Sequence, residues 1–90
     1  MAEVIWRNEA LADLDDVIAY ISQFDPDAAD GIGEKLFALG ESLADFPRRG
    51  RPASDGTREL VTVPPFVLGY EVAEGRVFIL SIRHGRQRPL

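Results

Sequence analysis

The residues whose types could carry chemistry lie in the second half of the chain, at and after its last predicted strand. The run Arg83-His84-Gly85-Arg86-Gln87-Arg88 surrounds the only histidine with arginines, and Arg58 lies on another strand-like segment. Arginine stays protonated, so it stabilises anionic groups well but is a poor base. The pattern therefore indicates a cationic site for an anionic group or a protein partner.

Each of these residues also has a purely structural explanation. A lone histidine at a strand end is more often a partly buried hydrogen-bonding residue than a catalyst. Arg58 can form a cross-strand ion pair of small energy with Glu59, and the arginines of the C-terminal run can simply be solvated. The residue types alone leave the structural and the functional interpretations open.

Charge divides the chain into two unequal halves. Residues 1–47 carry two basic and eleven acidic side chains, a balance of −9, whereas residues 48–90 carry eight arginines and four acids, a balance of +4. The net charge of −5 argues against non-specific binding of nucleic acid, because that affinity comes from Lys and Arg neutralising phosphates. We expect no direct binding of DNA by this chain alone, and a narrow basic site on its second half.

Composition limits the class of protein further. The length of 90 residues predicts one small domain, residues 1–90. Cysteine is missing from the sequence and histidine occurs once, so we expect no disulfide, no metal and no cofactor. The sequence holds no run of the roughly 20 apolar residues that a membrane span needs. The start, Met1-Ala2-Glu3-Val4, lacks the features of a signal peptide, so the expected location is cytoplasmic.

Two amphipathic helices are predicted after a short strand at Val4-Ile5-Trp6. The first spans roughly residues 8–22 with Asn8 as its N-cap, and the second begins with Asp25 as N-cap and Pro26 in the first helical position. The apolar face of the first helix is Leu11, Leu14, Ile18 and Ile21. That of the second, which stops before Pro47, is Ala29, Ile32, Leu36, Leu39, Leu43 and Phe46. The short connection makes the two helices antiparallel neighbours.

Small and aromatic residues beside these faces carry further expectations. Gly33 and Gly40 lie next to the second stripe, and Gly inside a helix costs about 0.5–1 kcal/mol relative to Ala. Close approach of the first helix is the simplest reason for both. Trp6 is expected in the core. Tyr20 and Phe37 point away from the main stripes and are the better candidates for a partner surface.

Three strands are predicted after the helices, at residues 57–63, 66–72 and 76–84, with a hairpin joining the last two. Strand alternation separates Phe78, Leu80 and Ile82 from the other side chains of the last strand, and this bulkier row is expected to pack on the helices. The expected class is α+β: a helical hairpin packed on a small, mainly antiparallel sheet, in the order β-α-α-β-β-β. Arg83 and Arg58 would then project from the open face of the sheet.

An ordered set of short motifs spans nearly the whole chain. They are Trp6, Ala10-Leu11-Ala12-Asp13-Leu14-Asp15, Ile18-Ala19-Tyr20-Ile21, Phe46-Pro47 with Gly50-Arg51, Gly56-Thr57-Arg58-Glu59-Leu60, Tyr70, and Ile79-Leu80-Ser81-Ile82 before Arg83-His84. Each motif is weak by itself, but the set in this order and spacing resembles the ParE/RelE superfamily of toxins from bacterial type II toxin–antitoxin pairs. The resemblance implies the same β-α-α-β-β-β fold.

The superfamily holds two activities: RelE-like members cut mRNA in the ribosome, and ParE-like members inhibit DNA gyrase. Attack by a 2′-hydroxyl needs a base, an acid and cations around one phosphate. A nuclease built on this chain would have to use Arg58, Arg83 and His84, since its only lysine, Lys35, is on a helix and its tail has no tyrosine. With a calculated pI of about 4.7, these features favour a ParE-like inhibitor over an enzyme.

The resemblance also implies a cognate antitoxin of the ParD or RelB kind, in a hetero-oligomer. Its C-terminal segment would dock by strand addition to a sheet edge or as a helix in a groove. Candidate residues for the antitoxin are Tyr20, Phe37, Arg58 and Arg83, and those for gyrase or the ribosome are Arg83, His84, Arg86 and Arg88. Two alternatives stay open, a ribosome-dependent mRNA endonuclease and a relative that binds an antitoxin without being toxic.

Overall fold

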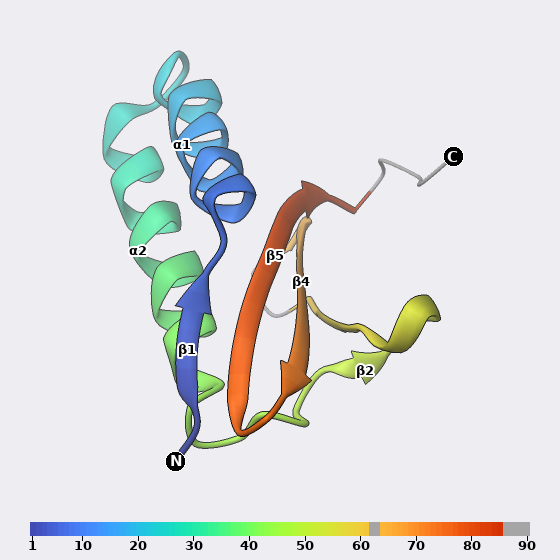
Figure 1. The fold of residues 1–90 in the computed structure, drawn as a ribbon. Coiled ribbons are helices and arrows are strands. Elements are labelled where there is room, and N and C mark those ends of the chain that lie inside the picture. Colours follow the sequence, from blue (N-terminus) through green and yellow to red (C-terminus); the bar gives the residue numbers. More distant parts are fainter. Residues whose placement is uncertain (62–63, 86–90) are drawn as a thin grey trace.

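A computed structural model describes residues 1–61 and 64–85, and in these residues a helical hairpin lies against one side of a five-stranded sheet (Figure 1). Its elements are β1 (Glu3–Trp6), α1 (Asn8–Ser22), α2 (Pro26–Ser42), β2 (Arg51–Pro52), a short 3-10 turn (Ser54–Gly56), β3 (Arg58–Leu60), β4 (Phe66–Ala73) and β5 (Arg76–His84). The strands lie in the order β1-β5-β4-β3-β2; β1 runs parallel to β5, and the other neighbours are antiparallel. The expected class and element order are confirmed, and β2 is an additional strand.

The strand boundaries differ from the predicted ones mainly at β3. This strand is shorter than the predicted segment 57–63, of which residues 62–63 lie outside the described part of the chain. The expected hairpin between β4 and β5 is confirmed. Its two turn residues, Glu74 and Gly75, have φ values of 54° and 75°. This left-handed pair suits a two-residue hairpin, because its twist matches that of the strands on either side.

The two helices begin in different ways. Asp25 caps α2 as predicted, because its carboxylate accepts the Ala28 N–H at 3.1 Å and Pro26 follows in the first turn. The prediction for Asn8 is wrong: Asn8 already lies inside α1, and Arg7 occupies the N-cap position without a side-chain hydrogen bond. The reason is that Arg7 still pairs with the sheet, through its N–H and the Ile79 carbonyl at 3.0 Å. Within the described residues no helix is long and apolar enough to cross a membrane.

The core lies between the hairpin and the sheet. Its buried members are Ala10, Leu14, Leu36, Leu39, Leu43, Leu60, Leu68, Tyr70, Val77, Ile79 and Ile82. Two residues of the predicted stripes are exposed instead: Leu11 is 42% exposed and Phe46 is 66% exposed. Ala10 is buried in place of Leu11, so the buried side of α1 is rotated from the predicted one. Phe46 lies beyond the end of α2, which is at Ser42.

Gly33 and Gly40 allow two different close contacts. A Cβ atom on Gly33 would lie 2.7 Å from Ile18 Cδ1, so approach of α1 explains this glycine as predicted. A Cβ atom on Gly40 would lie 2.4 Å from Cζ2 of Trp6, so the same explanation is wrong there. The indole comes from β1, stacks on Phe37 with ring centroids 5.3 Å apart, and packs against the edge of the core.

An irregularity in the pairing of β4 with β5 changes which side chains face the helices. Gly69 lies opposite Ser81, but the next residue, Tyr70, lies opposite Ile79, so Leu80 has no partner in the register. An extra residue of this kind reverses the alternation of the strand that carries it. Val77 and Ile79 therefore share the core face with Ile82. The prediction that Phe78 and Leu80 pack on the helices is wrong, whereas that for Ile82 is confirmed.

Candidate functional site

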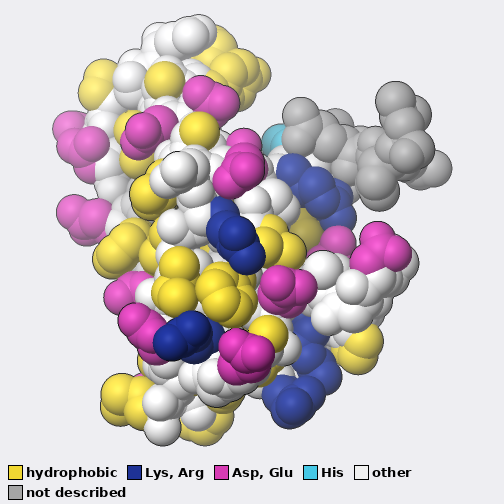
Figure 2. Space-filling view, in the orientation of Figure 1, with side chains coloured by type: hydrophobic (Ala, Val, Ile, Leu, Met, Phe, Trp, Pro, Cys, Tyr) yellow, Lys and Arg dark blue, Asp and Glu magenta, His cyan; other side chains and the backbone are white. Residues whose placement is uncertain are grey.

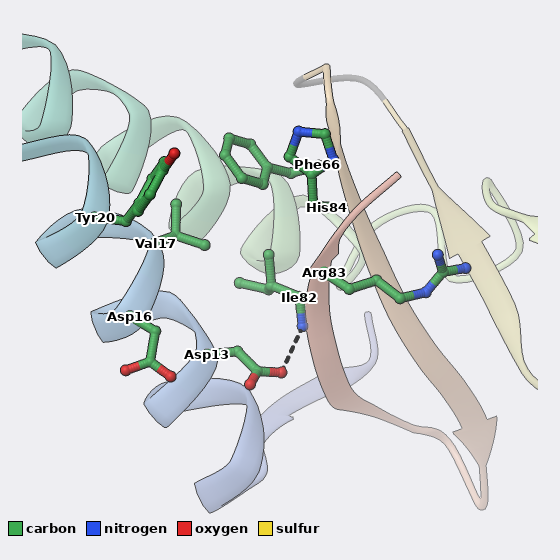
Figure 3. Close-up of a pocket in the computed structure, with 8 residues that line it drawn as sticks. All are labelled: Asp13, Asp16, Val17, Tyr20, Phe66, Ile82, Arg83 and His84. Atoms are coloured by element: carbon green, nitrogen blue, oxygen red, sulfur yellow. Dashed lines mark hydrogen bonds between the residues drawn. The ribbon is translucent and has the colours of Figure 1, made fainter. Parts of the chain in front are cut away.

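The last residues of β5 point alternately to the two sides of the sheet, and this separates Arg83 from His84. In Figure 3 the Arg83 side chain extends away from α1, whereas Ile82 points toward α1. His84 lies at the strand end beside Phe66, with ring centroids 6.0 Å apart in an edge-to-face arrangement. The two residues are adjacent in sequence, but their side chains diverge.

Arg83 belongs to a chain of ion pairs on the open side of the sheet. Its Nη2 donates to Oε2 of Glu59 at 2.6 Å, and Nη2 of Arg51 donates to Oε1 of the same carboxylate at 3.2 Å. The hydrogen bond from Arg83 is the main reason why the pKa of Glu59 lies below its ordinary value; burial opposes the shift and Arg51 adds to it. Glu59 therefore stays ionised and holds two arginines in fixed positions.

Arg58 occupies the other side of β3. It lies opposite the buried Tyr70 in the register and shares its side with the buried Leu60. Its Nη1 donates to the Gly50 carbonyl at 2.7 Å and to the Arg48 carbonyl at 3.3 Å. The expectation that Arg58 projects from the open face is therefore wrong. Its main partners are backbone carbonyls of the loop after α2, and it is Arg51 and Arg83 that pair with Glu59.

A groove of about 420 Å³ lies between α1 and the ends of β4 and β5 (Figure 3). We call it the α1–β5 groove. It is lined by Asp13, Asp16, Val17, Tyr20, Phe66, Ile82, Arg83 and His84. Its helix wall is acidic at Asp13 and Asp16, and Val17, Phe66 and Ile82 give it an apolar floor.

Asp13 closes the sheet edge beside this groove. The pairing of β1 with β5 ends where Trp6 meets Ile79, so the rest of β5 faces α1 in place of a strand. There Oδ2 of Asp13 accepts the Ile82 N–H at 3.0 Å (Figure 3). The sequence analysis assigned no such role to Asp13. The available signal was Ala10, which with Leu14 moves the buried side of α1 toward Asp13.

The two aromatic candidates for a partner surface lie in different places. Tyr20 is 64% exposed, lines the α1–β5 groove and meets Phe24 edge-to-face at 5.4 Å. Phe37 is 45% exposed and lies over Trp6, beside the seam between α1 and α2. Only Tyr20 is therefore beside the groove.

The remaining candidates concern charge and metal binding. Arg86 and Arg88 lie outside the described residues. In the part of the chain that is described, no three His, Cys, Asp or Glu side chains gather closely enough to hold a metal ion. Acidic side chains are scattered over the hairpin and basic ones lie mainly over the sheet (Figure 2), in keeping with the charge division of the sequence.

Comparison with known proteins gives consistent matches over almost all of the chain. Residues 4–89 match the family model described as the ParE toxin of the type II toxin–antitoxin system parDE. The chain is 50% identical over 84 residues to Toxin RelE2 of Caulobacter vibrioides, covering 93% of this chain and 96% of that protein. It is 31% identical over 83 residues to Toxin RelE1 of the same organism, covering 88% of each.

A solved structure agrees with these relatives. The chain superposes on a chain of the chromosomal ParDE system from P. aeruginosa with a TM-score of 0.85 and 25% identity, covering 93% of this chain and 96% of that one. The helical hairpin, the order of the strands and the match over residues 4–89 agree with one another. The chain belongs to the ParE toxin family of type II toxin–antitoxin systems.

Proposed function

We propose that this toxin inhibits growth by binding a protein target, DNA gyrase, and that a cognate ParD- or RelB-like antitoxin neutralises it. Binding of a protein target is supported by one observation in particular: the three side chains that a nuclease would need lie in different places. Arg83 lies on the open face, Arg58 is on the opposite side of the sheet, and His84 faces Phe66 at the groove. A base, an acid and cations must surround one phosphate to cleave RNA, so this arrangement supports binding rather than cleavage.

The electrostatics of the open face support the same proposal. Glu59 lies between Arg51 and Arg83, so a carboxylate occupies the position where an RNA phosphate would meet two guanidinium groups. Protonating this carboxylate would cost free energy, because the hydrogen bond from Arg83 and the one from Arg51 lower its pKa. An ordered set of alternating charges suits a protein surface, where complementary charges fix the orientation of the partner.

The target is tested with purified toxin and by induction in cells. We expect the toxin to inhibit supercoiling by gyrase, and the 5′ ends of cellular transcripts to stay unchanged after its induction. The control is the same toxin premixed with its antitoxin, which should restore supercoiling. Cuts at codon positions that disappear in His84→Ala or Arg83→Ala would instead show an mRNA endonuclease. Normal growth with intact antitoxin binding would show a binding module without toxicity.

For the antitoxin, the α1–β5 groove supports a docked amphipathic helix. Val17, Phe66 and Ile82 offer an apolar floor, and Tyr20 adds an exposed aromatic at the rim. An amphipathic helix buries its apolar stripe in such a groove. Of the other antitoxin candidates, Arg83 also lines the groove, whereas Phe37 and Arg58 do not. The acidic helix wall calls for a Lys or Arg on the antitoxin segment.

Exchanging one aspartate of α1 tests this docking mode. We expect Asp16→Lys to weaken antitoxin binding at least about 10-fold, because it places a positive charge where the partner's basic residue would lie. Asp15→Lys is the matched control: it changes the net charge equally from the neighbouring position, and Asp15 does not line the groove. Titration calorimetry measures both. Equal affinities for the two variants would place the antitoxin elsewhere.

A further inference from the structure

The loop after α2 presents an exposed aromatic side chain among arginines. Phe46 is 66% exposed, and together with Asp45, Pro47, Arg48 and Arg49 it lines a shallow hollow. We call residues 45–51 the arginine loop. Both Arg48 and Arg49 are exposed, and an exposed phenylalanine beside exposed arginines is the combination enriched at the centres of protein interfaces.

This loop is held in place from within the molecule. The hydroxyl oxygen of the buried Tyr70 accepts the Gly50 N–H at 2.7 Å. Arg58 donates to two carbonyls of the loop, those of Arg48 and Gly50, and Nη1 of Arg49 donates to Oγ of Ser42 at 3.3 Å. A surface whose backbone is fixed before binding loses less conformational entropy on association. Phe46 is thus an exposed side chain on a pre-organised support.

The arginine loop is also continuous with the cationic open face of the sheet. Arg51 belongs to the loop and pairs with Glu59, which in turn pairs with Arg83. The α1–β5 groove lies at the other end of β5, beside its last residues, whereas the chain leaves α2 near the start of β1, where Ala2 N–H donates to the Ala44 carbonyl at 2.8 Å (Figure 1). A partner in the groove and a partner on the loop would therefore meet different surfaces.

We infer that the arginine loop is part of the surface that binds the toxin's protein target, with Phe46 as its apolar anchor. The inference rests on the proposed function, in which the target is a protein. The fitting partner surface is an apolar recess bordered by Asp or Glu: the recess takes the Phe46 ring, and the acids face Arg48, Arg49 and Arg51. Charge complementarity favours this occupant, and so does the position of the loop at the opposite end of β5 from the last residues of that strand, where the groove proposed for the antitoxin lies.

The test replaces Phe46 by serine and compares it with Phe24→Ser, which removes a similarly exposed ring, 73% exposed, at the hairpin turn. Both variants should melt within about 3 °C of the wild type, as expected for surface positions. Phe46→Ser should weaken binding to immobilised gyrase about 10- to 30-fold, the range of an interface hot spot, and reduce growth inhibition. Phe24→Ser should change neither property. Arg48→Glu should act like Phe46→Ser, and Lys35→Glu on α2 serves as its charge control.

Several outcomes would overturn the inference. Unchanged gyrase binding and toxicity of Phe46→Ser, or an equal loss in Phe24→Ser, would remove the role of the loop. Weaker antitoxin affinity of Phe46→Ser would assign the loop to the antitoxin, and loss of a dimer in sedimentation would assign it to a second copy. If the wild-type toxin slows growth without binding gyrase, gyrase is not the target. In that case, loss of toxicity in Phe46→Ser but not in Phe24→Ser would still support a role of the arginine loop in binding another target. If the wild-type toxin neither slows growth nor binds gyrase, both the proposed function and the role of the arginine loop are contradicted.

Discussion

Replacing Gly50 by alanine is expected to lower the free energy of unfolding by about 2–4 kcal/mol. A Cβ atom at this position would lie 2.7 Å from Cε1 and from the hydroxyl oxygen of Tyr70, and 2.8 Å from the Glu59 carbonyl oxygen. Neither neighbour can yield easily, because Tyr70 is fully buried and the carbonyl belongs to β3. Moving Tyr70 would also break its hydrogen bond with the Gly50 N–H.

Gly31→Ala is the matched control for this change. Gly31 lies inside α2, and a Cβ atom there would meet nothing within 4 Å. Alanine should therefore stabilise the protein by about 0.5–1 kcal/mol through its higher helix propensity. Urea unfolding followed by circular dichroism measures both variants. Similar midpoints for Gly50→Ala and the wild type would mean that the contact between the loop and Tyr70 is looser than described.

Trp6→Ala should lower the free energy of unfolding by about 2–4 kcal/mol. The expected loss is somewhat smaller than the roughly 3–5 kcal/mol for a fully buried aromatic, because Trp6 is only partly buried. The indole fills the space over Gly40, stacks on Phe37 and donates from Nε1 to a carboxylate oxygen of Glu41 at 3.1 Å. All these partners are on α2, so the ring attaches that helix to β1. Its loss leaves a cavity that the backbone of α2 cannot fill without moving.

Two further variants separate packing from hydrogen bonding at Trp6. Trp6→Phe keeps an aromatic ring for the stack and loses the bond to Glu41, so we expect a cost of about 1 kcal/mol. Phe24→Ala removes an exposed ring and should change stability by no more than about 0.5 kcal/mol. Thermal melts and denaturant titrations give the values. If Trp6→Ala costs no more than Phe24→Ala, the indole does not join β1 to α2.

The sequence predicted the elements that depend on local patterns. The order of the elements, the Asp25 cap and the β4–β5 hairpin are all set by residues close together in the chain. The predicted range of α1 is correct, but its N-cap was assigned to Asn8 instead of Arg7, for a reason that the local pattern cannot contain. Arg7 pairs with Ile79, more than seventy residues away in sequence, and this contact fixes where β1 ends.

The faces of β5 show a second limit of pattern analysis. Strict alternation predicted one row through Phe78, Leu80 and Ile82, but the extra residue opposite the Gly69/Tyr70 step splits that row. Nothing in the composition of β5 marks the irregularity, because every residue from Val77 to Ile82 except Ser81 is apolar. The side of Arg58, by contrast, could have been predicted: it shares a side with Leu60, and a leucine on a three-residue strand beside the core is expected to be buried.

The candidate site was only partly visible in the sequence. Arg83, His84 and Tyr20 were among the residues predicted from the sequence, and all three line the α1–β5 groove. The contacts that define the site connect distant segments: Asp13 with Ile82, Glu59 with Arg83, and Gly50 with Tyr70. A single sequence holds no direct signal for such pairs, so the roles of Asp13 and Glu59 required the structure.

The parallel pairing of β1 with β5 has a consequence for translation. β1 can join the sheet only after β5 has been synthesised, since β5 inserts between β1 and β4 and supplies Val77, Ile79 and Ile82 to the core. A product that stops before residue 76 would lack the strand that unites the two parts of the sheet. The five-stranded sheet can therefore form only after residues 76–84 have been synthesised, and until then the apolar side chains of the two helices lack the strand that completes their core.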